Sequence, residues 1–148
     1  MGKRREAREY TLQLLFQIEF NDAQPDEQIL SQFWTGKRPQ REAREYCSRL
    51  FRGIHERRQS LDAVIQSVSE HWRISRMAHV DRNILRMAAY ELLFEKDLAP
   101  PIVINEAIEI AKKYSSEQAA TFINGILDAM KKDLGAIQKR IKEEENVT

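Results

Sequence analysis

Hydrophobic residues recur along most of the chain every three or four positions, the spacing that places them on one side of an α-helix. No stretch shows the alternation of β-branched or aromatic residues with polar residues that is typical of a strand. The pattern therefore predicts an all-α fold, a compact single-domain helical bundle of about seven helices over residues 1–148. Residues 1–5 and 136–148 are expected to fray.

The same pattern locates the individual helices. The first begins near the N-terminal cations, and Asn21-Asp22 and Pro25 predict a turn after it. Apolar faces follow in residues 29–34, 43–54, 61–68, 80–93, 103–114 and 119–134. The fourth of these segments, in HVDRNILRMAAYELLFEKD, is apolar on more than one side, which predicts a central helix.

Several residue types predict where helices begin and end. Pro39 suits the first turn of a helix, and Ser60 suits an N-cap. Ser115 followed by Gln118 fits a capping box, and Gly135 is a candidate stop.

Gly125 lies inside the last predicted helix, where a glycine is unfavourable. Asn124-Gly125 would indicate a hairpin turn in isolation, but the helical pattern continues on both sides. Glycine costs about 1 kcal/mol relative to alanine in a helix interior. We therefore expect either a close approach of another helix or a contacted surface at Gly125.

Composition narrows the class of protein. Of the 148 residues, 32% are charged and 42% hydrophobic, which is typical of a globular protein and not of a disordered chain. No apolar run approaches the roughly 20 residues needed to cross a bilayer, so we expect a cytoplasmic protein. The single cysteine, Cys47, lies on an apolar helix face and is predicted to be a core residue.

The N-terminal cations are unusual in a chain with a net charge of only +1. Lys3, Arg4, Arg5 and Arg8 lie at the start of the first helix, where the helix dipole favours acidic side chains. At about 100° per residue the three arginines share one third of the helix circumference. Two interpretations stay open: a solvated basic tail and a phosphate-binding arm. For the phosphate-binding arm, replacing the three arginines together by alanine is expected to weaken RNA binding and barely change stability.

Residues 37–58 carry a second concentration of positive charge, with eight basic side chains and three acidic ones. A basic face of this kind can steer RNA even when the whole chain is nearly neutral.

No set of residues predicts catalysis. His55, His71 and His79 lack the spacing of metal ligands, and the chain has no glycine-rich phosphate loop and no nucleophile elbow. The sequence therefore predicts neither a metal site nor a cofactor, and a protein that is not an enzyme.

Five motifs in a fixed order resemble the NusB family of transcription antitermination factors. They are RREAR, LQLLFQIE, VDRNILRMAAYELLF, IVINEAIEIAKKY and FINGILD. The resemblance spans nearly the whole chain, and it implies a helical RNA-binding adaptor. Its implied ligand is a boxA-type single-stranded element of nascent ribosomal RNA, and its implied partners are the NusE ribosomal protein and the transcription elongation complex. A homodimer stays open, as does an alternative function as a purely protein-binding helical adaptor without RNA affinity.

The resemblance also assigns residues. It implies RNA contacts beside the arginine arm, which we define as Lys3, Arg4, Arg5 and Arg8. These further RNA contacts are Phe122, Asn124, Lys112 and Lys113, with Phe122 alternatively a core residue. For the protein partner it implies Arg76, Asp81 and Arg82. Where the family often has glycine, an acid and serine before FINGILD, this chain has Ser115, Gln118 and Ala119, so its RNA contacts near that turn are expected to differ.

Overall fold

The computed structural model of the protein describes residues 2–20 and 24–147, which form eight α-helices and one short 3₁₀ turn without a strand among them. The predicted all-α fold is confirmed, with one helix more than expected. None of the described helices combines the length and the apolar character that a membrane-spanning segment needs. The predicted turn at Asn21-Asp22 lies outside the described residues.

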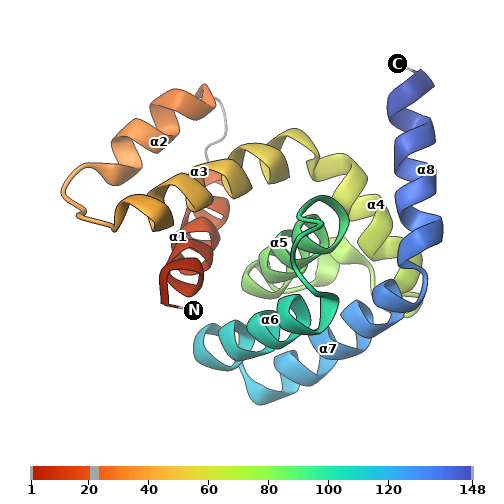
Figure 1. Cartoon of the computed structure of the whole chain (residues 1–148). Coiled ribbons are helices and arrows are strands. Elements are labelled where there is room, and N and C mark those ends of the chain that lie inside the picture. The colour runs from red at the N-terminus through yellow and green to blue at the C-terminus, as the bar shows by residue number, and fades with distance from the viewer. Residues whose placement is uncertain (1, 21–23, 148) are drawn as a thin grey trace. The chain divides into compact units, whose positions relative to one another are not determined.

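The chain divides into two compact units, Met1–Glu56 and Arg57–Thr148. The first contains α1 (Gly2–Ile18), α2 (Asp26–Trp34) and α3 (Arg41–Glu56), and α1 packs on α3 (Figure 1). The predicted apolar face of α3 is buried along its whole length.

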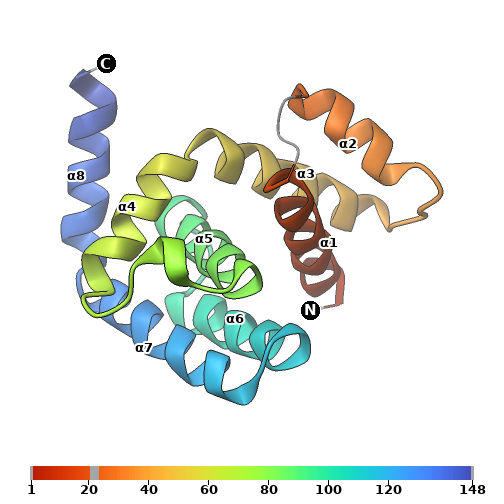
Figure 2. The same ribbon diagram turned by 180° about the vertical axis from the view of Figure 1, so that it is seen from behind.

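The second unit is built around α5 (His79–Phe94), of which 11 of 16 residues are buried. Helices α4 (Arg58–Val68), α6 (Pro100–Tyr114) and α7 (Glu117–Lys132) pack against it. A connection containing the 3₁₀ turn η1 (Ile74–Arg76) joins α4 to α5 (Figure 2). The prediction of a central helix is therefore correct for this unit. The whole-chain single domain stays a prediction.

A buried ion pair joins α4 to α5. The Arg86 guanidinium donates to both carboxylate oxygens of Asp62, at 2.6 and 2.9 Å, and to the side-chain oxygen of Asn83 at 3.0 Å. Because Arg86 is 4% exposed, its charge needs these acceptors. The fork geometry fixes the register of the two helices.

Three predicted helix ends are wrong by one to three residues. Pro39 precedes α3 instead of lying in its first turn, and Ser60 lies inside α4, which begins at Arg58. Ser116, not Ser115, caps α7: its Oγ accepts a hydrogen bond from the Ala119 amide at 2.9 Å. The predicted capping box of Ser115 and Gln118 therefore does not form. Either of two neighbouring serines could cap the helix, and the residue at which α7 begins makes Ser116 the N-cap.

The C-terminal segment also differs from expectation. Gly135 does not stop the last helix; α7 ends at Lys132, and a further helix, α8 (Leu134–Val147), occupies the segment expected to fray. Ile137 and Ile141 are one helical turn apart and both buried. Burial of these two side chains stabilises the segment as a helix.

Candidate nucleic-acid interface

The arginine arm lies against one aromatic ring of α3. The guanidinium carbon of Arg4 lies 4.6 Å from the centre of the Tyr46 ring, and those of Arg8 and Arg49 lie at 5.9 and 5.0 Å. A cation over an aromatic face is attracted by the ring quadrupole. Tyr46 is buried. Its ring brings together three guanidinium groups, from α1 and α3, at one place on the first unit.

The four cations of the arm differ in exposure. The Lys3 side chain is 51% exposed and its Nζ lies 3.1 Å from a carboxylate oxygen of Glu42. Arg4 and Arg5 are half-buried. Arg8 is only 3% exposed, so it is not the solvated side chain that a basic tail would present.

A shallow pocket of about 240 Å³ opens between the arm and α3. Its lining residues are Lys3, Arg4, Glu42, Glu45, Tyr46 and Arg49. Cations therefore surround a hollow that two carboxylates also border, which limits the local positive potential. Arg49 was not singled out in the sequence, although it lies three residues beyond Tyr46 and so on the same helix face.

The second group of predicted RNA contacts lies on α6 and α7. Phe122 is half-buried and meets Trp72 edge to face, with ring centres 5.8 Å apart. Trp72 is 58% exposed and had no predicted role. Asn124 is exposed on α7. The prediction that Phe122 contributes to a surface thus has a physical basis, since bases stack on exposed aromatic rings.

Two lysines near the end of α6 extend into solvent. The Lys112 Nζ lies 3.9 Å from a Glu109 carboxylate oxygen, and the Lys113 Nζ lies 5.2 Å from the centre of the Tyr114 ring. Both lysines are exposed and belong to the last helical turn, where positive charge favours the helix dipole.

Two of the predicted partner-binding residues share a pocket with Phe122. A hollow of about 420 Å³ is lined by Arg76 and Asp81 as well as by Phe122, Trp72 and Gln118. The Asp81 Oδ1 is buried and meets no hydrogen-bond donor among the described residues. The sequence assigned these side chains to separate RNA and protein contacts, whereas the second unit brings them to one surface.

Arg82 has a different environment. One guanidinium nitrogen donates to the Ile74 carbonyl at 3.2 Å, and another lies 2.8 Å from the His79 Nδ1. These contacts tie η1 to the first turn of α5. Arg82 therefore has a structural part in holding the connection that carries Arg76.

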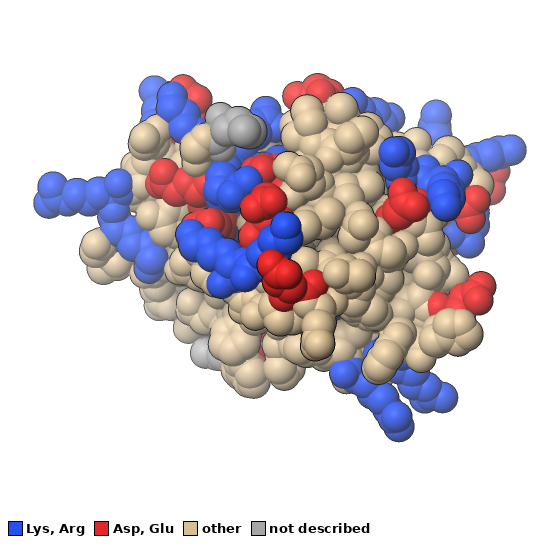
Figure 3. All heavy atoms as spheres, turned by 90° about the horizontal axis from the view of Figure 1, so that it is seen from below, with Lys and Arg blue, Asp and Glu red and all other residues tan. Residues whose placement is uncertain are grey.

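The arm belongs to the first unit and Phe122 to the second, so their expected proximity stays a prediction. Figure 3 shows one face, on which Lys and Arg side chains stand beside Asp and Glu side chains. Among the described residues, no three or more acidic, histidine or cysteine side chains are grouped as a metal ion would require.

Comparison with known proteins identifies the family. The model described as "NusB family" matches residues 5–132, most of the chain. This chain belongs to the NusB family. It is 45% identical over 128 residues to the transcription antitermination protein NusB of Anaeromyxobacter dehalogenans, covering 86% of this chain and 89% of that relative.

Solved NusB structures share the fold. NusB of T. maritima is 42% identical, with a TM-score of 0.77 over 92% of this chain and 90% of its own. A NusB determined with NusE and double-stranded RNA is 28% identical, with a TM-score of 0.75 over 95% of this chain and 98% of its own. The family resemblance stated from the five motifs is confirmed.

Proposed function

We propose that this chain is an RNA-binding transcription antitermination factor, which binds a boxA-type single-stranded element of nascent ribosomal RNA together with the NusE ribosomal protein. In this proposal it joins the transcription elongation complex in the cytoplasm and catalyses no reaction. The relatives named for antitermination, and the NusB structure that contains both NusE and RNA, support it.

The observation that carries the proposal is the set of guanidinium groups around Tyr46. Arg4, Arg8 and Arg49 come from two helices and converge on one ring. One guanidinium group can donate two parallel hydrogen bonds to the oxygens of a phosphate. The Tyr46 ring would position these guanidinium groups before a ligand binds.

The surface of the second unit suits the rest of the ligand. In this proposal, Trp72 and Phe122 offer rings to the bases, Asn124 offers an amide, and Lys112 and Lys113 offer positive charge. Single-stranded RNA recognition combines stacking with such polar groups. Arg76 and Asp81 border the same hollow, so RNA and the NusE-like partner would bind side by side there.

One observation favours the second candidate, a protein-binding adaptor without RNA affinity. Lys3 already has Glu42 as an ion-pair partner, and Glu45 lines the same pocket as the arm. If these carboxylates neutralise the arm, its cations stabilise the helix pair and bind no phosphate.

Salt dependence separates the two candidates. Fluorescence titration of a boxA-like RNA should show log affinity falling with log salt at a slope of roughly −2 to −3, because three or four phosphates are neutralised at about −0.7 each. Arg4→Ala should weaken this binding, because it removes one of the guanidinium groups over Tyr46, whereas Lys131→Ala, a change at an exposed lysine of α7, should not. Absence of RNA binding at low salt would overturn the proposal and favour the protein-only adaptor.

A further inference from the structure

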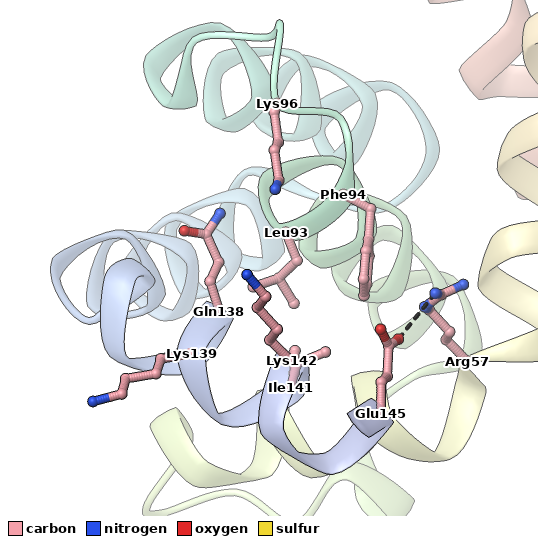
Figure 4. Close-up of a pocket in the computed structure, with 9 residues that line it drawn as sticks. All are labelled: Arg57, Leu93, Phe94, Lys96, Gln138, Lys139, Ile141, Lys142 and Glu145. Carbon is pink, nitrogen blue, oxygen red and sulfur yellow. Dashed lines mark hydrogen bonds and ion pairs between the residues drawn. The ribbon is translucent and has the colours of Figure 1, made fainter. Parts of the chain in front are cut away.

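A second basic hollow lies in the second unit, and none of its lining residues is among the predicted RNA or partner contacts. It measures about 450 Å³ and lies between α8 and the C-terminal end of α5 (Figure 4). Its lining residues are Arg57, Leu93, Phe94, Lys96, Gln138, Lys139, Ile141, Lys142 and Glu145. Helix α8 lies beyond residue 132, where the match to the family model ends.

Two lysines converge on one side of it. Figure 4 shows the Lys96 and Lys142 side chains extending toward each other, with the Gln138 amide beside them, while Lys139 points away. Lys96 and Lys142 are exposed, and neither forms an ion pair with a residue of the described segments. An anion between two ammonium groups that extend toward each other would interact favourably with both.

The carboxylate in the hollow is already engaged. A Glu145 carboxylate oxygen lies 2.9 Å from the Arg57 Nη2, and the Arg57 guanidinium lies 4.3 Å from the centre of the Phe94 ring. Arg57 therefore neutralises Glu145, and the charge left on the lysine side is positive.

The aromatic ring does not offer a free face for a base. Phe94 has Arg57 over its ring and Tyr90 at 5.1 Å between ring centres. Recognition in this hollow must come from charge and from the Gln138 amide, not from stacking. Lysine binds phosphate as a point charge, and an amide can donate a hydrogen bond to a phosphate oxygen.

We infer that Lys96, Lys142 and Gln138 form a second phosphate-binding site, which holds the backbone of RNA flanking the boxA-type element without reading its sequence. The volume is within the range of small-ligand pockets and accommodates a phosphate with its sugar. This inference rests on the proposed function, since it assigns to α8 a further segment of the same RNA. The shared chemistry is that of phosphate, which free inorganic phosphate could also supply.

The test compares a boxA-like RNA with the same RNA carrying uridine tails of increasing length at either end. Tails should tighten binding to the wild-type chain. In Lys96→Gln/Lys142→Gln, affinity for the tailed RNA should fall roughly threefold to tenfold and the salt slope should become shallower by about 1.4, two contacts at 0.7 each. The matched control is Lys139→Gln, since Lys139 lies on α8 like Lys142 but points away from the hollow. This variant should still bind tailed RNA more tightly than untailed RNA.

The outcomes separate the two claims. Binding of the untailed RNA reports the proposed function, and only the difference between tailed and untailed RNA reports the second site. The inference is overturned if tails add no affinity, if the double variant keeps the gain, or if Lys139→Gln loses it equally. Calorimetric titration with inorganic phosphate forms the other arm: saturation that depends on Lys96 and Lys142, without an effect of RNA tails, would assign the hollow to the free anion instead. Thermal melting should show that all three chains are equally folded.

Discussion

At the scale of single residues, the cations of the arginine arm are not equivalent. Arg8 is buried and lies near the Tyr46 ring, while Lys3 is half exposed. Helical spacing placed both on the basic face of α1, but spacing cannot tell how closely another helix covers that face. A variant that replaces all three arginines therefore tests stability and binding at once.

We predict that Arg8→Ala lowers the free energy of unfolding by roughly 1–3 kcal/mol, because it removes buried packing of the arginine stem and leaves its neighbours without their contacts. Lys3→Ala should change it by less than about 0.5 kcal/mol, as an exposed ion pair contributes little. Urea unfolding of both variants gives the comparison. Equal stability of the two variants would show that the burial of Arg8 has no energetic weight.

Glu42 is predicted to weaken RNA binding. Its carboxylate lies 3.1 Å from the Lys3 Nζ and competes with phosphate for that ammonium group. Glu42→Gln should therefore raise RNA affinity about twofold to threefold at low salt, with the difference shrinking as salt screens the charges. Glu42→Asp keeps the charge and serves as the control. A loss of affinity in the glutamine variant would mean that Glu42 positions the lysine for RNA.

Cys47 is the core residue that the sequence predicted, and its burial has a pH consequence. Burial raises the pKa of the Cys47 thiol to about 11, partly opposed by a hydrogen bond with Thr11. The unfolded thiol ionises first, so its contribution to stability is intact below about pH 9 and is lost as the pH rises through 11. Unfolding curves should show the wild type losing more stability than Cys47→Ala between pH 8 and pH 11. Parallel loss in both chains would contradict this.

At the scale of helices, the sequence predicted which segments are helical but not where each ends. The sequence identified α5 as the central helix because a helix buried on several sides has apolar residues on more than one face, over many residues. A helix end depends on one or two side chains: Ser115 and Ser116 are both competent caps, and only the packed structure selects Ser116. Helix α8 was missed because Gly135 and a charged tail outweighed two isoleucines, Ile137 and Ile141, whose burial depends on a neighbouring helix.

The same limit applies to the candidate interface. The sequence indicated the arginines of α1 and Phe122, because motif and charge mark them directly. It did not indicate Arg49 or Trp72, whose significance comes from the rings they meet, Tyr46 and Phe122. The spacing of apolar residues shows which face of one helix is buried. It does not show which residues of two different segments come into contact to form a site.

Gly125 gives a prediction for α7. The expected close approach of another helix is not found, since a Cβ added there would meet nothing within 4 Å. Gly125 is exposed and borders a small hollow with Trp72 and Phe122. Gly125→Ala should therefore stabilise the chain by up to about 1 kcal/mol, as alanine is the better helix former. If the hollow receives RNA, the same variant should bind more weakly; thermal melting and RNA titration measure the two effects separately.

At the scale of the whole molecule, each of the two compact units carries part of the surface that we propose binds the ligand. The first carries the arginine arm and the second carries Trp72, Phe122, Arg76 and Asp81. A few phosphate contacts on flexible RNA leave little free energy after the ordering cost, so the chain alone should bind RNA modestly. A NusE-like partner at the Asp81 surface would then strengthen RNA binding by acting at high effective concentration.

The most direct test of the proposed adaptor mechanism is the full binding cycle of the chain, boxA-like RNA and NusE, measured by titration calorimetry. Linkage requires RNA to strengthen partner binding by the same factor by which the partner strengthens RNA binding. Asp81→Asn, which keeps the side-chain shape, should weaken the partner steps and leave binary RNA affinity unchanged. We predict tighter RNA binding when NusE is present. Equal RNA affinity with and without NusE would contradict it.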